Sequence, residues 1–345
     1  MPHDPVAAAL ARFGCVATEP PTRIGAGTLN DNYLVRTNRG AFVLRRIRID
    51  QPDARVALEH ETIRWVAAHG IPAPEPLLPI DDARIPNDEL PSTCARIQSS
   101  ATNGAAEVGR WVLFPFVEGG HVARGSLRTA EAAALGDMHG RLHALLRDHP
   151  RSAGASFDMH WSPEQSAALL ERIETIARSE HAPTDVIDGI ALQRRLLDRT
   201  DILPPSAFAD LPCQWLHGDF HVEQVLFDDD ANVAAVLDWE LCQSNARVWE
   251  LLRSLAFSGL LDGHPDAVDY VRGYRRHVHI ERDEVERGLT LWWQSRIVGV
   301  WVWWAAFIGR NERVHTLIPD VVADLRHIAE SGRCERVNRL IVGAL

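Results

Sequence analysis

The chain has 345 residues, of which 46% are hydrophobic and 24% are charged, and its formal net charge is −11. This composition is ordinary for a globular protein with a large core or two lobes. The negative balance argues against a surface for nucleic acid or for an anionic membrane. The five cysteines are odd in number and form no CxxC pair, so neither a disulfide framework nor a zinc site is expected.

The sequence shows little sign of a signal peptide or of a membrane-spanning helix. The N-terminal stretch MPHDPVAAALARF lacks the basic region of a signal peptide. No uncharged run reaches the length of about 18 apolar residues that a membrane helix needs. We therefore expect a cytoplasmic protein that does not cross a membrane.

The first third of the chain predicts strands mixed with two helices. PVAAALARFG reads as a short helix, and DARVALEHETIRWVAAHG reads as a longer one that ends at Gly70. Between them, RIGAGTLNDNYLVRT reads as a Gly-containing turn followed by an alternating strand, and AFVLRRIRI reads as a second strand. The short turn NRG joins the two strands, which predicts an antiparallel hairpin. IPAPEPLLP cannot be helical because of its prolines. TCARIQ and RWVLFPFVEG are two further strand candidates, and SSATNGAAEVG between them is typical of a loop.

From about residue 128 the chain turns helical. TAEAAALGDMHGRLHALL carries apolar residues at helical spacing, and more helices are expected over 163–179, 185–199, 246–258, 282–308 and 315–331. Three short β segments, QWLHGDF, VLF and VAAVLDW, interrupt this region. A β-rich part, a connector near 114–119 and a helical part together predict an α+β protein.

One stretch, WLHGDFHVEQVLFDDDANVAAVLDWE, gathers the residues with chemical potential. Gln224 follows Asp219 of the HGD tripeptide by five residues, and Asp238 ends a later apolar run. Phosphoryl transfer needs a carboxylate that orients and deprotonates the attacking hydroxyl, and oxygen ligands that hold Mg²⁺ against the nucleotide phosphates. Asp219, Gln224 and Asp238 supply these three groups in that order.

HGDFHVEQVLF followed by VLDWE is similar to the aminoglycoside phosphotransferase superfamily, which includes aminoglycoside, homoserine, choline and methylthioribose kinases and shares the eukaryotic protein-kinase fold. The family pattern is H-G-D-x-H-x-x-N followed by I/L-D-W/F. The matching positions are His217, Gly218, Asp219, His221 and Asp238. Gln224 stands where the family has Asn, so the neighbouring Glu223 remains an alternative metal ligand.

The resemblance implies a bilobal protein-kinase-like fold, with an N-lobe over residues 1–117 and a C-lobe over 118–345. It also implies roles: Asp219 as catalytic base, and Gln224 and Asp238 as Mg²⁺ ligands. The co-substrate would be ATP, with GTP as an alternative.

The resemblance extends into the N-lobe. GAGTLNDNYLVRTNRGAFVLRR looks like the family's nucleotide loop and following strand, which assigns Gly25 and Gly27 to nucleotide binding. Arg45 stands where the family's phosphate-contacting Lys usually lies, and its geometry differs from that of Lys. Glu59 is expected to pair with Arg45 because it lies on the inward stripe of its helix, and Glu61 is the second choice.

VLFPFVEGG is similar to the family's hinge. This likeness makes Phe114 the gatekeeper and directs the Pro115 carbonyl and the Val117 N–H toward the adenine edge. LGDMHGRLHALL matches the family helix that ends in Leu-His, here at His143.

Several polar residues are expected to be structural. His217 and His221 would brace the catalytic loop, and Glu250 would support it. His139 and His143 have the i,i+4 spacing of a metal chelate, but a role in helix packing is favoured. The C-terminal tryptophans are expected in the core, with the alternative that some line the acceptor pocket; they are Trp292, Trp293, Trp301, Trp303 and Trp304.

We therefore expect a Mg²⁺-dependent kinase that phosphorylates a hydroxyl of a small molecule such as an aminoglycoside, an amino alcohol, homoserine or a sugar. Its partners would be this acceptor and a nucleotide, without nucleic acid or membrane; the sequence does not indicate the oligomeric state. One alternative is a Ser/Thr protein kinase of the bacterial stress-response type. The other is a nucleotide-binding pseudokinase, suggested by the unusual Gln224 and Arg45.

Overall fold

The computed structural model describes residues 4–25, 30–80, 93–100, 106–261, 264–330 and 333–345. Strands and helices are both present, as the sequence predicts, and they divide into two compact units. The first comprises Met1–Val122, His217–Asp219 and Glu223–Cys242, and the second comprises Ala123–Leu216, Phe220–Val222 and Gln243–Leu345. The predicted lobe boundary between residues 117 and 118 stays a prediction. Each unit is described by itself.

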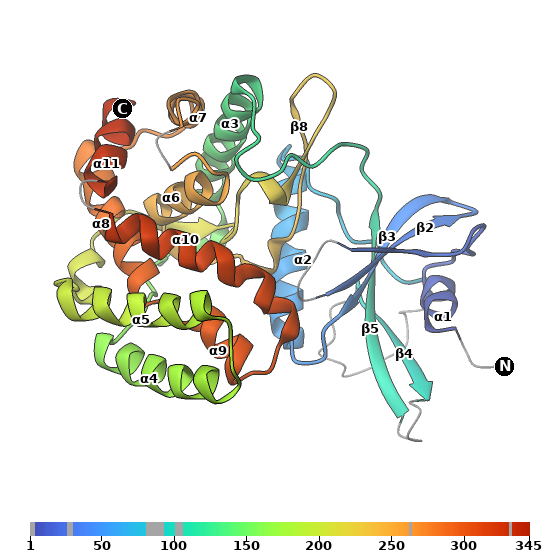
Figure 1. Ribbon diagram of the computed structural model, residues 1–345. Helices are drawn as coiled ribbons and strands as arrows, with labels where there is room; N and C mark the ends of the chain where they lie inside the picture. Colours follow the sequence, from blue (N-terminus) through green and yellow to red (C-terminus); the bar gives the residue numbers. More distant parts are fainter. Residues whose placement is uncertain (1–3, 26–29, 81–92, 101–105, 262–263, 331–332) are drawn as a thin grey trace. The chain divides into compact units, whose positions relative to one another are not determined.

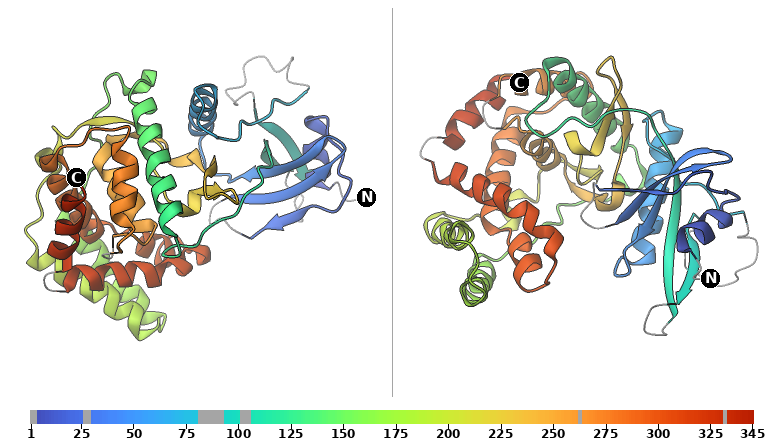
Figure 2. Two further views of the ribbon diagram at one scale, coloured as in Figure 1. Left: turned by 90° about the horizontal axis from the view of Figure 1, so that it is seen from above. Right: turned by 45° about the vertical axis from the view of Figure 1, so that its right-hand side comes forward.

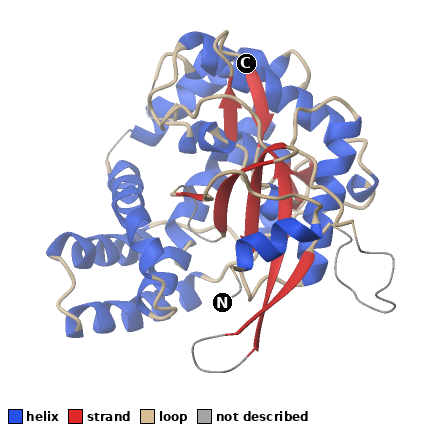
Figure 3. Cartoon of the chain, turned by 90° about the vertical axis from the view of Figure 1, so that its right-hand side faces the viewer, coloured by secondary structure: helices blue, strands red, loops and turns tan. Residues whose placement is uncertain are grey.

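The first unit contains a five-stranded antiparallel sheet with the order β1-β2-β3-β5-β4. Figure 3 shows these strands in red. The predicted hairpin is confirmed, because Thr37 pairs with Gly40 across its turn. The strands are β1 (Thr22–Ile24), β2 (Asp31–Thr37), β3 (Gly40–Ile47), β4 (Ala95–Ser100) and β5 (Ala106–Pro115).

The loop expected over SSATNGAAEVG is shorter than predicted. Strand β5 already begins at Ala106, which pairs with Ser100 at the end of β4. The cross-strand ladder thus continues into residues that read as loop from their small side chains.

Helix α1 (Pro5–Arg12) covers part of this sheet (Figure 1). The Asp4 side chain caps its N-terminus by accepting a hydrogen bond from the Val6 N–H, and Pro5 occupies the first turn, where no N–H is needed. Leu10 and Phe13 are buried in one apolar cluster with residues of β2, β3 and β5. Burial of these side chains fixes the helix against the sheet.

Helix α2 (Asp53–Ala68) ends before Gly70, whose φ of +87° favours glycine, as the sequence predicts. Val56, Glu59 and Ile63 are buried along one side of it. The following proline-rich stretch is not helical. Its Pro72 carbonyl accepts a hydrogen bond from the Val236 N–H, so it is tied to strand β8.

Strands β7 (Val225–Phe227) and β8 (Val233–Val236) form a hairpin in the first unit. The Asp228 carboxylate accepts hydrogen bonds from the N–H groups of Asp230 and Asn232, which closes the turn. β6 (Cys213–Leu216) belongs to the second unit and pairs with β9 (Gln243–Ala246), a strand that the sequence analysis did not predict.

The second unit is mainly helical, and two views of it appear in Figure 2. Helix α3 approaches α7 so closely that a Cβ on Gly136 would lie 2.0 Å from the Tyr270 carbonyl oxygen. The helices are α3 (Thr129–Leu146), α4 (Pro163–Ser179), α5 (Thr184–Arg199), α6 (Arg247–Phe257), α7 (Ala267–Arg275), α8 (Arg282–Val298), α9 (Trp301–Phe307), α10 (Ile318–Ala329) and α11 (Arg333–Gly343). Two of them, α7 and α11, were not predicted. In the described part of the chain, no helix combines the length and apolar character needed to cross a membrane.

The single helix expected over 282–308 is wrong. The chain breaks at Gly299 into α8 and α9, and Gly299 is extended at φ −74° and ψ 112°. The break leaves carbonyls of the last turn of α8 without helical partners. Gln193 Nε2 donates to the Gly299 oxygen at 2.9 Å, and Ser166 Oγ donates to the Val298 oxygen at 2.9 Å. Side chains of α5 and α4 thus stabilise the interruption.

Candidate active site

The backbone of the HGD segment in the first unit is constrained by close contacts and hydrogen bonds. Gly218 has a φ of +87°, and a Cβ there would lie 1.9 Å from the Leu241 carbonyl oxygen. Only glycine fits this position. His217 Nε2 donates to the Leu237 oxygen at 2.8 Å, and its Nδ1 accepts the Asp219 N–H at 3.2 Å. Its ring also lies against Trp239. These bonds fit the bracing role expected for His217.

Asp219 and Gln224 face each other in the structure. Gln224 Nε2 lies 3.5 Å from Asp219 Oδ2, at the long limit of a hydrogen bond. The Leu237 N–H donates to the Gln224 main-chain oxygen at 2.7 Å, which links the segment with Gln224 to the one with Asp238. Asp219 and Gln224 are therefore in contact, and the residue before Asp238 is bonded to the Gln224 main chain. Glu223, the alternative ligand, is exposed.

Asp238 follows β8 in a left-handed backbone conformation, with φ 57° and ψ 66°. Such a conformation is uncommon outside glycine, although Asp tolerates it better than most residues. Its Oδ1 is buried and has no hydrogen-bond partner among the described residues. Leaving a buried carboxylate oxygen unbonded is costly, typically by about 1–3 kcal/mol or more.

This unbonded oxygen is the local test of whether a metal ion fits. Mg²⁺ prefers carboxylate and carbonyl oxygens, and Asp238 Oδ1 together with the side-chain oxygen of Gln224 are of that type. The residues present therefore suit a divalent cation.

Arg45 forms the ion pair expected from the sequence. Its Nη1 lies 3.1 Å from Glu59 Oε1, and its Nε donates to Asn32 Oδ1 at 3.2 Å. Glu59 is 4% exposed, whereas Glu61 is exposed to solvent. Burial raises the pKa of Glu59 to about 7, although Arg45 opposes this shift. The guanidinium also lies over the Phe114 ring, 5.2 Å from its centroid.

Three further residues of this region were missed by the sequence analysis. Glu240 Oε2 accepts a hydrogen bond from Asn30 Nδ2 at 2.9 Å, and Arg55 Nη2 donates to the Glu240 main-chain oxygen at 2.7 Å. Burial, followed by the nearby Asp238 carboxylate, raises the pKa of Glu240. The sequence signal for Glu240 was its place two residues after Asp238 in DWE.

The residues expected to bind nucleotide lie at two ends of the sheet. Gly25 directly follows β1, whereas Gly27 lies outside the described residues. Phe114 and Pro115 end strand β5, where they pair with Val43 and Phe42 of β3. Among the described residues no backbone carbonyl accepts the N–H of Val117, and its place in a hinge stays a prediction.

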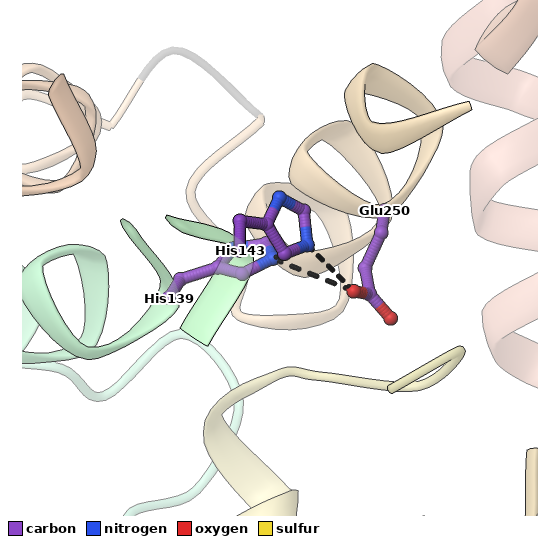
Figure 4. A group of neighbouring side chains, drawn as sticks. All are labelled: His139, His143 and Glu250. Carbon is purple, nitrogen blue, oxygen red and sulfur yellow. Dashed lines mark hydrogen bonds and ion pairs between the residues drawn. The ribbon is translucent and has the colours of Figure 1, made fainter. Parts of the chain in front are cut away.

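A buried polar cluster in the second unit consists of His139, His143 and Glu250 (Figure 4). Glu250 Oε2 lies 2.7 Å from His143 Nε2 and 3.7 Å from His139 Nε2. Burial alone would raise the pKa of Glu250, but the hydrogen bonds of the two histidines outweigh burial and lower it. Tyr270 and Tyr274 bond to the Nδ1 atoms of His139 and His143, respectively.

This cluster contacts the residue that follows Asp219 in the chain. Phe220, the residue after Asp219, stacks on His139 with ring centroids 4.5 Å apart. The donor types would also suit a zinc ion. However, both Nδ1 atoms already bond to tyrosine hydroxyls and His143 Nε2 bonds to Glu250, so hydrogen bonding accounts for most of the cluster. His221 makes a separate ring contact with Phe257, at 5.5 Å.

Comparison with known proteins bears on these observations. The model of a family described as "Phosphotransferase enzyme family" matches residues 21–286. The homoserine kinase of Burkholderia cenocepacia (strain HI2424) is 28% identical over 204 residues, covering 59% of this chain and 52% of the relative. That of Burkholderia multivorans (strain ATCC 17616 / 249) is 26% identical over 208 residues, with the same coverage. The chain thus spans about half the length of the curated relatives it matches.

Solved structures resemble the whole chain. The microcompartment-associated aminopropanol kinase has a TM-score of 0.63 at 15% identity, covering 97% of this chain and 98% of that chain. The amicoumacin kinase hAmiN, in complex with AMP-PNP, Ca²⁺ and Ami, has a TM-score of 0.58 at 13% identity, covering 92% and 93%. A spectinomycin phosphotransferase in complex with ADP has 0.58 at 12%, covering 99% and 98%. These likenesses confirm the predicted fold.

Proposed function

The chain belongs to the phosphotransferase enzyme family, and from this premise we propose that it transfers the γ-phosphoryl group of ATP to a hydroxyl of a small molecule. In this reaction the acceptor oxygen forms a bond to the γ-phosphorus, and the bond between that phosphorus and the bridging oxygen breaks. ADP leaves, and the hydroxyl proton passes to Asp219. GTP is the alternative donor.

The observation that carries this proposal is the arrangement of Asp219, Gln224 and Asp238 in one unit. The Asp219 N–H donates a hydrogen bond to His217 Nδ1, and the Asp219 carboxylate faces Gln224. Asp238 has a buried oxygen without a hydrogen-bond partner among the described residues. In our proposal Asp219 orients and deprotonates the acceptor, whereas Gln224 and Asp238 hold Mg²⁺. Mg²⁺, when bound, would neutralise the negative charge on the phosphates.

The remaining predicted residues have supporting roles. Arg45, positioned by Glu59, would contact a phosphate, since a guanidinium binds phosphate oxygens in pairs. Gly25, Gly27, Phe114, Pro115 and Val117 would surround the nucleotide. The protein would act in the cytoplasm on a freely diffusing acceptor.

The direct test is incubation of the purified protein with Mg²⁺ and γ-labelled ATP, together with a panel of small hydroxyl compounds and a generic protein substrate. Mass spectrometry then identifies the product. A phosphorylated small molecule supports the proposal. A phosphorylated protein would indicate the Ser/Thr kinase alternative, and nucleotide binding without any transfer would indicate a pseudokinase.

A further inference from the structure

The second unit contains a cavity of about 150 Å³ between helices α6, α8, α9 and α10. Figure 1 shows α6, α8 and α10 close together, in agreement with the residues that line the cavity. Three tryptophans form much of its wall: Trp249, Trp292 and Trp301. Trp292 is buried, whereas Trp301 is 56% exposed and marks the open side. The alternative that some C-terminal tryptophans line a pocket therefore has a structural basis.

The charged groups of this cavity are unusual for a protein with a net charge of −11. Its lining contains two guanidiniums, Arg253 and Arg296, and one carboxylate, Asp324. The Asp324 carboxylate pairs with Arg296 at 2.7 Å and also lies 3.6 Å from Arg124, so one negative charge faces two guanidiniums. The lining thus places two guanidiniums beside one carboxylate.

The arginines converge on one aromatic ring. The guanidinium carbons of Arg124, Arg253 and Arg296 lie 5.6, 4.5 and 5.7 Å from the centroid of Phe257. Arg253 also lies over Trp249. Like charges held this close repel one another, and burial, together with Arg253 and Arg124, lowers the pKa of Arg296.

One donor in this group is unused. Arg296 Nε is buried and has no hydrogen-bond partner among the described residues. A guanidinium presents its N–H groups as a planar fork that matches a carboxylate or phosphate. An anion in the cavity would supply an acceptor and offset the repulsion among the arginines. A cationic acceptor would meet aromatic rings that already carry guanidiniums.

Covalent connection relates this cavity to the reacting loop. Phe257 also contacts the His221 ring. His221 follows Asp219 by two residues, so their Cα atoms are separated by at most about 7.6 Å. An acceptor anchored beside Phe257 would therefore lie close to His221, which belongs to the same unit.

The geometry points to an acceptor that carries an anionic group, a carboxylate or a phosphate, bound by Arg253 and Arg296. This inference rests on the proposed phosphotransferase function and specifies its acceptor class. The volume sets the size of the enclosed part, because an apolar cavity of about 150 Å³ holds a molecule as large as benzene. A compact hydroxy acid or hydroxyl-bearing amino acid fits better than a large polycationic antibiotic.

Three compounds that differ by one group provide the test. L-Homoserine has both an amine and a carboxylate, 4-hydroxybutyrate lacks the amine, and 3-amino-1-propanol lacks the carboxylate. Binding is measured by calorimetry without nucleotide, and turnover is measured with Mg²⁺-ATP. The first two compounds should bind at least about tenfold more tightly than 3-amino-1-propanol. Glycerol 3-phosphate replaces the carboxylate by a phosphate and separates the two anions.

Variants assign the effect to the arginines. Arg253→Gln should weaken binding of 4-hydroxybutyrate by about 10- to 100-fold and leave 3-amino-1-propanol unchanged. Arg253→Lys should recover part of the loss, because it restores charge without the planar fork. In turnover, KM should rise more than kcat falls. Arg282→Gln, which removes an exposed arginine paired with Glu286, is the matched control and should behave as wild type.

Two results would overturn the inference. One is preferential binding of 3-amino-1-propanol, and the other is an equal effect of Arg253→Gln on all the compounds. Failure of the proposed function looks different: no compound is phosphorylated and Mg²⁺-ADP does not stabilise the protein. Calorimetry still reports on the cavity in that case.

Discussion

Arg45 Nη1 lies 3.8 Å from Asp238 Oδ1, the oxygen that accepts no hydrogen bond within the described residues. At this distance the two groups attract each other but form no hydrogen bond. Arg45 instead donates to Glu59 and Asn32. This arrangement supports the roles that we propose, with Asp238 as a ligand of the cation and Arg45 beside it as a phosphate contact.

Asp238→Ala should therefore abolish the effect of Mg²⁺ on nucleotide binding. Removing the carboxylate takes away the oxygen that we assign to the metal. The measurement is the melting temperature with ADP, with and without Mg²⁺. The exposed Asp230→Ala serves as a control. A variant that still responds to Mg²⁺ like the wild type would contradict the assignment.

Asp219→Asn should keep ATP binding and lose turnover by about 10²–10⁴-fold, the usual effect of removing a general base. The amide preserves shape and can still face Gln224, so folding should be unaffected. Turnover and nucleotide affinity are measured on the same preparation. Unchanged turnover would rule out this role for Asp219.

Gln224→Asn should retain activity or raise the apparent affinity for Mg²⁺. Both side chains offer the same carbonyl oxygen, but Gln has one more rotor to order, at a cost of at most about 1 kcal/mol. Gln224→Ala should lower the affinity, because the ligand oxygen is lost. The measurement is the Mg²⁺ dependence of turnover.

Glu223→Ala is the control for Gln224, since the exposed Glu223 is the alternative ligand. It should match the wild type. If Glu223→Ala weakens Mg²⁺ dependence while Gln224→Ala does not, the ligand is Glu223.

His60 should make stability depend on pH. Burial, then Arg45 and Arg64, lowers its pKa from 6.5 to about 3. The unfolded chain therefore binds a proton below pH 6.5, whereas the folded protein does not until about pH 3. Stability that is present above pH 6.5 is lost as the pH falls, by about 2 kcal/mol at pH 5.

His60→Gln removes this titration and can still bond to Thr93, the partner of His60 Nδ1 at 2.5 Å. The free energy of unfolding is measured by urea titration between pH 5 and pH 8. The difference between the wild type and the variant should shift in favour of the variant as the pH falls. Parallel curves would show that His60 titrates normally in the folded state.

Gly136→Ala should destabilise the second unit strongly. The added Cβ would lie 2.0 Å from the Tyr270 oxygen, a backbone atom that cannot turn away. Separating α3 from α7 should cost about 1–3 kcal/mol or more. Ala at Gly343 is a helix-end control, because no described atom lies within 4 Å of its would-be Cβ. An equal melting temperature for both variants would contradict the close approach.

The sequence by itself determined the chemical motif and most local elements. The HGD tripeptide, Gln224 and Asp238 are close along the chain, so their order and spacing were enough to predict phosphoryl transfer. Helices such as 163–179 were also predictable, because apolar periodicity and a Ser-Pro start are local signals. The α+β class followed because the strand pattern of the first third of the chain changes to helical periodicity near residue 128.

The tertiary structure alone decided what distant segments do together. Helix periodicity does not reveal that Gln193 and Ser166 would accommodate a break at Gly299. It does not bring Asn30, Arg55 and Glu240 into contact, nor gather Arg253, Arg296 and Asp324 around one cavity. Such contacts join residues tens to hundreds of positions apart. They depend on the packing of whole helices, which no short window of sequence contains.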